Sequence, residues 1–232
     1  MGRAAPVALV LALALAGAAP ASASAEAPAV VPALRAWKPA PGSFAFRRDA
    51  RVVVAARDRA VLSDEARTLA ADLAAVTGRP VTVASRARGG DVVLRRMGAS
   101  RALGTEGYRL QVGRVLTVSA PTTAGAFYGG RTVLQLRRLG AVVPRGAATD
   151  RPAYRERGLM IDVGRRYYPR SWLAARIREL GDLKLNMLHL HLSDTQGFRI
   201  RSARHPEAVT PSALSRADVA ARRHEAFAAD VA

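Results

Sequence analysis

Residues 157–194, RGLMIDVGRRYYPRSWLAARIRELGDLKLNMLHLHLSD, decide how the second half of the chain folds. Two short apolar runs enclose a segment in which Leu173, Ile177 and Leu180 recur at the spacing of one helix face. Strand, helix and strand in this order predict a βαβ unit, whose parallel strands are buried by helices. No third clear strand follows Phe198, so we expect only the beginning of a larger α/β fold.

The second apolar run carries two histidines, one residue apart. Strand periodicity places His189 and His191 on one face and three leucines on the other. Such a pair at the end of a barrel strand is typical of metal-dependent amidohydrolases, which need further His and Asp ligands from later strands. The remaining histidines of this chain follow no strand. We therefore favour histidines that are packed or hydrogen-bonded in a core over a metal site.

Three charged residues mark the ends of the two predicted strands. Asp194 follows the second strand at its C-terminal end, where α/β barrels place their sites; the alternative is a cap for the following turn. Arg157 begins the first strand, and its guanidinium fork suits sugar hydroxyls, although spacing alone favours a solvated or salt-bridged residue. Asp162 ends the first strand and is expected to be a structural partner for one of the many arginines.

The preceding residues predict a separate domain. A short β-branched run comes before a helix that Ser63 caps and Gly78 ends. Further strands, a hairpin turning at Gly113 and a closing helix complete the pattern. We expect an α+β domain over residues 46–152, with the second unit occupying residues 153–232.

The N-terminus has the pattern of an export signal. A basic residue, a short apolar run and small residues predict a secretory signal over residues 1–25, cleaved near Ala23 or Ala25. The apolar run falls short of the ~20 residues of a spanning helix, so we expect no stable membrane span. Residues 26–45 are rich in Ala and Pro and are expected to form a lead-in. The mature protein is therefore expected to be secreted, either extracellular or periplasmic.

The formal net charge of +18 invites a nucleic-acid interpretation, which we discount. The arginines are scattered, no aromatic residues are interleaved with them to stack bases, and the abundance of Ala indicates compositional bias. The absence of cysteine excludes disulfides, thiolate metal sites and a cysteine nucleophile. We expect no nucleic-acid partner.

Two stretches of the sequence resemble a known family. Residues 154–200, YRERGLMIDVGRRYYPRSWLAARIRELGDLKLNMLHLHLSDTQGFRI, resemble the start of the catalytic barrel of glycoside hydrolase family 20, the β-N-acetylhexosaminidases. Residues 106–136, EGYRLQVGRVLTVSAPTTAGAFYGGRTVLQL, resemble the end of the α+β domain that precedes this barrel in bacterial members. The resemblance implies an α+β N-terminal domain followed by the start of an incomplete (β/α)8 TIM barrel.

The resemblance also implies an activity and roles for individual residues. Members remove terminal non-reducing GlcNAc or GalNAc residues from glycans or chitooligosaccharides with retention, by a substrate-assisted mechanism that needs no cofactor or metal. Arg157 would bind sugar hydroxyls and Asp194 would belong to the network beneath the pocket. His189, His191 and Asp162 would be structural. The sequence departs from the family at position 195, where many members have a second Asp.

The catalytic Asp-Glu pair of the family follows a later barrel strand and has no counterpart in this sequence. We therefore expect no catalytic residue in the chain itself, and a truncated, inactive piece of an exported glycosidase. One alternative is a non-catalytic carbohydrate-binding or structural fragment. The other is a metal-dependent amidohydrolase that uses His189 and His191.

Overall fold

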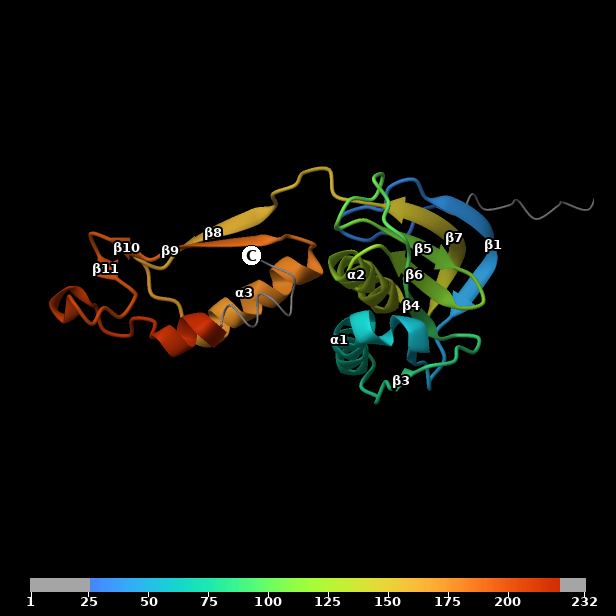
Figure 1. Cartoon of the computed structure of the whole chain (residues 1–232), viewed down its shortest axis with the longest axis horizontal. Coiled ribbons are helices and arrows are strands. Elements are labelled where there is room, and N and C mark those ends of the chain that lie inside the picture. Colours follow the sequence, from blue (N-terminus) through green and yellow to red (C-terminus); the bar gives the residue numbers. More distant parts are fainter. Residues whose placement is uncertain (1–25, 222–232) are drawn as a thin grey trace, which may run out of the picture.

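The computed structural model describes residues 26–221, and the predicted export signal lies outside them. The described chain forms a sheet domain and a smaller βαβ part, which lie beside each other (Figure 1). Among the described residues, no helix combines the length and apolar composition that crossing a bilayer requires.

The sheet domain has one mixed sheet of seven strands, in the order β1-β7-β5-β6-β4-β2-β3. Its strands are β1 (Lys38–Ala45), β2 (Val52–Val54), β3 (Val83–Ala84), β4 (Val92–Arg96), β5 (Tyr108–Val112), β6 (Leu116–Ala120) and β7 (Val142–Asp150). Helices α1 (Arg59–Thr77) and α2 (Thr123–Leu139) cover one face of this sheet (Figure 1). A short 3-10 turn, Ala56–Asp58, precedes α1.

The β5–β6 hairpin shows why the sheet has one buried and one open face. Tyr108 and Leu110 of β5 and Leu116 and Val118 of β6 are almost fully buried, while the residues between them are half-buried or exposed. Because successive side chains of a strand point to opposite faces, the buried set faces the helices. The antiparallel pairing of these strands confirms the predicted hairpin.

Helix α1 begins one turn earlier than its sequence indicated. Ser63 lies inside the helix and donates its hydroxyl to the Arg59 carbonyl at 2.5 Å, so it is not the N-cap. Gly78 ends the helix as predicted, because its φ of 66° is a left-handed conformation that glycine adopts without steric cost.

The prediction of an unpacked lead-in over residues 26–45 is wrong. Residues 38–45 form β1, which pairs antiparallel with β7 at the edge of the sheet. Phe44 is only 2% exposed, and Val30 is also buried in the same core. Proline lacks an amide donor and fits an edge strand, so Pro39 and Pro41 disguised β1 as a linker.

Two neighbouring glycines of α2 offer a test of its packing. A Cβ at position 129 would clash with the side chain of Val118 and lie 3.1 Å from the Tyr108 ring, whereas one at position 130 would meet Leu69 at 3.6 Å. We expect Gly129→Ala to lower the free energy of unfolding by about 1–3 kcal/mol through overpacking. Gly130→Ala should leave it unchanged or raise it by up to about 1 kcal/mol, because alanine favours the helix. Urea unfolding of both variants checks this, and equal destabilisation would contradict it.

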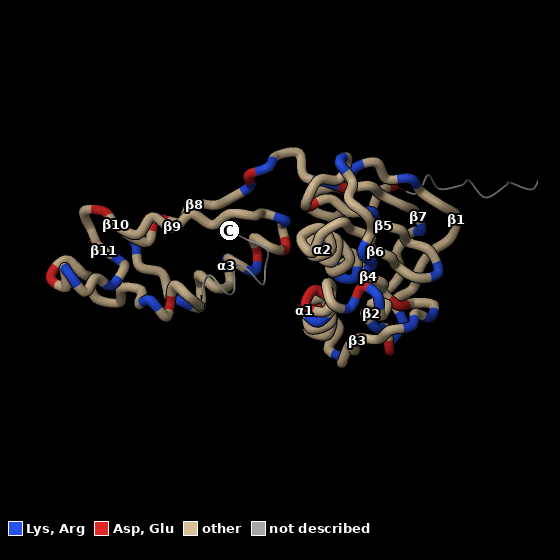
Figure 2. The backbone as a smooth tube through the Cα atoms, viewed as in Figure 1, with Lys and Arg blue, Asp and Glu red and all other residues tan. Residues whose placement is uncertain are grey.

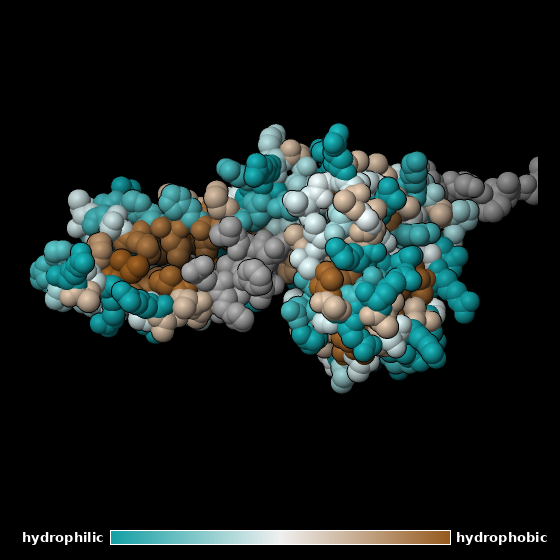
Figure 3. Space-filling view, in the orientation of Figure 1, coloured by the Kyte–Doolittle hydropathy of each residue, from teal (hydrophilic) through white to brown (hydrophobic). Residues whose placement is uncertain are grey.

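The second part contains the predicted βαβ unit. Its elements are β8 (Gly158–Asp162), α3 (Arg170–Asp182) and β9 (Met187–His191), followed by β10 (Ser193–Asp194), β11 (Gly197–Phe198) and the 3-10 turn Pro206–Ala208. Strands β8 and β9 are parallel, and Leu173 and Ile177 of α3 are buried, as the spacing predicted. Figure 3 shows apolar surface gathered on this part of the molecule, near β9 and α3.

Polar contacts join the two parts. The ammonium of Lys184, just after α3, lies 2.7 Å from the Tyr108 hydroxyl and 3.1 Å from an Asp150 carboxylate oxygen, and all three residues are buried. Asp182 at the end of α3 pairs with Arg131 and Arg138 of α2, at 3.2 and 3.0 Å. The sheet domain thus holds the loop that leads from α3 into β9.

Candidate functional site

Four charged or ionisable side chains meet at the C-terminal ends of β8 and β9. Asp162 and His191 end these strands as directly paired residues, and Asp194 follows on β10. Arg165 lies three residues beyond the end of β8 and donates from Nε to Asp194 Oδ2 at 3.0 Å. The same oxygen lies 3.2 Å from His191 Nε2. These four residues form the strand-end cluster.

Asp162 orients Arg165 within this cluster. One of its carboxylate oxygens accepts the backbone N–H of Arg165 at 2.9 Å, and the other lies 3.5 Å from the guanidinium Nε. The backbone bond fixes the turn after β8, so the arginine side chain returns over the strand ends towards Asp194. Asp162 therefore contacts an arginine of the turn that follows its own strand.

Hydrogen bonds keep Asp194 ionised. The pKa of its carboxyl is lowered from 3.8 to about 2, first by the backbone N–H of Thr195 and then by the Thr195 hydroxyl, with smaller contributions from His191 and Arg165. Both Thr195 groups donate to Oδ1, at 2.7 and 3.0 Å, while Arg165 and His191 contact Oδ2. The hydroxyl of Thr195 thus supplies the second-largest of these effects, after the backbone N–H of the same residue.

We expect Thr195→Ala to raise the pKa of Asp194 from about 2 towards 3.8. The substitution removes the hydroxyl donor and keeps the backbone donor, so the carboxylate loses only part of its stabilisation. A folded-state pKa below the ordinary value means that this stabilisation is present above pH 3.8 and is lost as the pH falls through about 2. Carboxyl-carbon NMR titration measures the shift, with Thr210→Ala as the control that does not contact Asp194. An unchanged pKa would contradict the assignment.

The two histidines differ in their surroundings within the described chain. His189 is exposed on the strand face opposite the partly buried leucines, directly paired with Met160. His191 is half-buried and contacts Asp194. The predicted alternation of β9 is correct, because the intervening leucines pack against the apolar cluster around Leu173.

A metal-ligand set that uses both histidines is not assembled among the described residues. Asp162, His191 and Asp194 bring one ligand atom each within 4.8 Å of one another, but His189 is not part of that group. The Arg165 guanidinium already lies against the two carboxylates. A cation placed there would meet the positive charge of Arg165, so the arrangement favours an arginine-centred site.

Arg157 lies at the other end of β8, away from the strand-end cluster. Its guanidinium donates to the backbone carbonyls of Lys184 and Tyr154, both at 2.8 Å, and pairs with Glu106 at 2.8 Å. Barrel enzymes place their sites at the C-terminal ends of the strands. The placement of Arg157 therefore gives no support to the prediction that it binds sugar hydroxyls, and points to a role in joining β8 to the sheet domain.

Arg165 is the residue that our sequence reasoning missed. Its side chain is 65% exposed, in contrast to 13% for Arg157. A signal was available, because Arg165 follows the C-terminal end of a predicted strand just as Asp194 does. Barrel sites lie at the C-terminal ends of the strands, and a search of every charged residue at these ends selects Arg165.

Comparison with known proteins agrees with this architecture. Residues 27–151 match the family description "Glycosyl hydrolase family 20, domain 2", and residues 154–229 match "Glycosyl hydrolase family 20, catalytic domain". The chain is 37% identical to a Cellulomonas fimi β-N-acetylhexosaminidase over 62% of its own length and 31% of that protein. It is 31% identical to a Bifidobacterium bifidum lacto-N-biosidase over 71% of its length and 15% of that protein.

A solved structure, the GH20 β-N-acetylhexosaminidase from Streptomyces coelicolor A3(2), superposes with a TM-score of 0.74 and 28% identity. The match covers 87% of this chain and 44% of that one. The chain thus spans less than half the length of these relatives. The predicted fold class, an α+β domain followed by the start of a TIM barrel, is confirmed. The chain belongs to glycoside hydrolase family 20.

Proposed function

We propose that this chain is part of an exported glycosidase that removes terminal non-reducing N-acetylhexosamine residues from glycans or chitooligosaccharides. Membership of family 20 supports the reaction class, and relatives carry the names β-N-acetylhexosaminidase and N,N'-diacetylchitobiase. The observation that carries the proposal is the strand-end cluster, which lies where an α/β barrel binds its substrate. Export rests on the sequence of residues 1–25, and mass spectrometry of the secreted protein tests cleavage near Ala23 or Ala25.

Arg165, in place of Arg157, is the arginine that we assign to the sugar. Asp194 holds its Nε, and within the described chain its two terminal nitrogens make no hydrogen bond. These nitrogens can donate to neighbouring hydroxyls of one sugar ring, because the guanidinium is planar and its donors are fixed in a fork. Asp194 and Asp162 then act as positioning residues that aim the fork.

The reaction that we propose is hydrolysis with retention, assisted by the substrate. The carbonyl oxygen of the 2-acetamido group attacks the anomeric carbon, a carboxylic acid protonates the leaving oxygen, and water then opens the cyclic intermediate. The family resemblance assigns an Asp-Glu pair from a later strand to the acetamide and to the leaving group. Within the described residues, the carboxylates at the strand ends are Asp162 and Asp194, and both are engaged with Arg165. We therefore propose that the 232 residues alone do not turn over substrate.

A chimaeric enzyme tests this proposal. Residues 26–200 would replace the corresponding part of the Streptomyces coelicolor enzyme, whose remaining barrel supplies the later strands. We expect the chimaera to hydrolyse p-nitrophenyl N-acetyl-β-glucosaminide, and NMR to show the β-anomer as the first product. The 232-residue chain should release no p-nitrophenol above a mock preparation. A folded but inactive chimaera, or inversion at the anomeric carbon, would contradict the proposal.

A further inference from the structure

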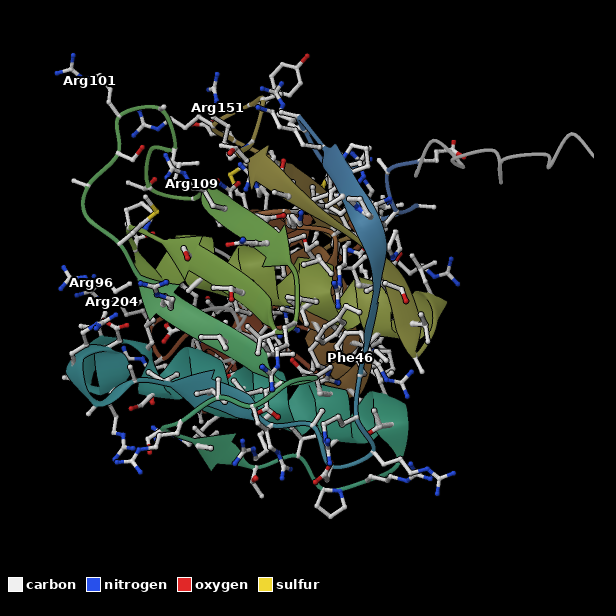
Figure 4. The ribbon with its side chains drawn as sticks, turned by 90° about the vertical axis from the view of Figure 1, so that its right-hand side faces the viewer. Phe46, Arg96, Arg101, Arg109, Arg151 and Arg204 are labelled. Atoms are coloured by element: carbon white, nitrogen blue, oxygen red, sulfur yellow. The ribbon has the colours of Figure 1, made fainter. Side chains whose placement is uncertain are left out.

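The sheet domain has a second exposed surface that the proposed activity does not use. Helices α1 and α2 cover one face of the sheet, and the barrel part lies beyond α2 (Figure 1). Figure 4 looks onto the opposite face, which no helix covers, and shows Arg109 on it and Arg151 at its upper edge. This face lies on the far side of the sheet from the strand-end cluster.

Strand register aligns two arginines and two hydroxyl residues across this face. Arg95 of β4 is directly paired with Ser119 of β6, Ser119 with Arg109 of β5, and Arg109 with Thr149 of β7. Paired residues of adjacent strands point to the same face, and strands lie ~4.8 Å apart. The two arginine Cα atoms are therefore separated by ~10 Å, with a hydroxyl between them. Arg151, two residues beyond Thr149, continues the face.

The arginines of this row have no acidic partner. Among the described residues, the side chains of Arg95, Arg109 and Arg151 take part in no ion pair or hydrogen bond, and all three residues are exposed. Two acidic residues close to this row in the sequence are already engaged, because Asp150 turns to the buried face and binds Lys184, and Glu106 pairs with Arg157. Glu156, on the segment that connects the two parts, is exposed and makes no ion pair within the described chain. Like charges gathered on one face repel each other, and an anionic ligand relieves that repulsion.

The neighbouring side chains indicate which kind of anion fits. Arg95, Ser119, Arg109 and Thr149 supply charged forks and hydroxyls, and the next row supplies Gln111 and Thr117. Arginine binds carboxylate or sulfate through paired hydrogen bonds, and hydroxyl and amide groups between the forks suit sugar hydroxyls. Neither row contains an aromatic side chain for stacking bases, and the apolar members of the second row are a half-buried Val93 and a small Ala147, which do not suit entry into a bilayer.

We propose that this face of the sheet domain binds an anionic polysaccharide, through carboxylate or sulfate groups of successive sugars. Such a surface holds the protein on an acidic glycan matrix while the strand-end cluster is free for its own substrate. The site is separate from the proposed glycosidase reaction and needs no part of it.

Binding of polygalacturonate by the whole 232-residue chain tests the proposal. This polymer carries one carboxylate on each sugar and no N-acetylhexosamine, so its binding does not depend on the proposed glycosidase site. We expect saturable binding at low ionic strength that weakens as salt screens the charges. The double variant Arg95→Gln/Arg109→Gln should raise the Kd about tenfold or more, because both charged forks are lost.

A matched control is needed because basic residues are spread over both parts of the molecule (Figure 2). Arg79→Gln/Arg86→Gln removes the same charge from two exposed arginines near β3, whose side chains have no ion pair within the described chain. This variant should bind polygalacturonate within about twofold of the unmodified protein, the change expected from net charge alone.

Three results would overturn the proposal. The first is no binding by the unmodified chain, and the second is an equal loss in the two double variants, which would reduce the effect to net charge. The third is displacement of polygalacturonate by duplex DNA or phosphatidylglycerol vesicles that bind more tightly through Arg95 and Arg109. Circular dichroism of each variant confirms that the comparison is between folded proteins.

Discussion

Lys184→Met is expected to lower the free energy of unfolding by about 3–5 kcal/mol, as for other buried ion pairs that lose one partner. Lys184 and Asp150 are 7% and 6% exposed, and the ammonium is the cation that faces Asp150 Oδ2. Methionine fills a similar volume but leaves the carboxylate buried without a counter-charge. Tyr108 still donates its hydroxyl to that oxygen at 2.6 Å, which offsets only part of the loss.

Two further variants separate the charge from the packing. Lys184→Met/Asp150→Leu removes both charges and should recover most of the lost stability, because replacing a whole buried pair by apolar residues is often neutral. Arg138→Gln breaks an ion pair at the same junction, but this arginine is 46% exposed, so the change should cost less than about 1 kcal/mol. Urea unfolding followed by tryptophan fluorescence measures all three. If Lys184→Met lowered the free energy of unfolding no more than Arg138→Gln does, the buried pair would not be what holds the two parts together.

The Asp150 carboxylate helps to keep the buried Lys184 ammonium charged. Burial lowers the pKa of the Lys184 ammonium, and the Asp150 carboxylate opposes that change. Burial, followed by the charge of Asp150, raises the pKa of Tyr108 well above its usual value, so its hydroxyl stays protonated and can donate. Lys184 also has a φ of 59°, a left-handed conformation that costs a non-glycine residue about 1–2 kcal/mol. The contacts with Asp150 and Tyr108 hold the residue in this conformation.

The sequence predicted the elements whose side-chain pattern is set locally. The β5–β6 hairpin alternates without interruption, and α3 repeats its apolar residues every three or four positions, so both were found. Strand β1 was missed because it is an edge strand with Pro39, Pro41 and Gly42, and its burial depends on β7, about 100 residues later in the chain. Pairing between strands so far apart in the chain depends on the tertiary structure and cannot be inferred from a short stretch of sequence.

The candidate site was predicted in part, for a similar reason. Asp194 was selected because it ends a strand, and the structure places it at the centre of the strand-end cluster. Arg157 was selected because it stands beside the glycine of the family motif, and it lies at the N-terminal end of β8, away from the strand-end cluster. Arg165 reaches Asp194, and Arg157 does not, because of the turn that follows β8. The hydrogen bond from the Arg165 amide to Asp162 fixes this turn, and it cannot be inferred from the sequence.

Arg165→Lys, in the active chimaera, is expected to lower kcat/KM for p-nitrophenyl N-acetyl-β-glucosaminide by roughly 10- to 150-fold. Lysine keeps the charge but has no planar fork, so it cannot be held by Asp194 and bind two sugar hydroxyls at once. Hydrogen bonds to charged groups contribute about 1.5–3 kcal/mol, and about 1.4 kcal/mol corresponds to a tenfold change in kcat/KM.

Arg157→Lys is the matched control, because it is the same substitution at the other end of β8. It should leave kcat/KM within about threefold and lower the free energy of unfolding, since the bonds that Arg157 makes to Glu106, Lys184 and Tyr154 join the barrel to the sheet domain. We therefore expect a crossed pattern, in which Arg165→Lys reduces turnover and Arg157→Lys reduces stability. If Arg157→Lys lost activity and Arg165→Lys kept it, the sugar would be held at the N-terminal end of β8, and the strand-end cluster would be only a structural network.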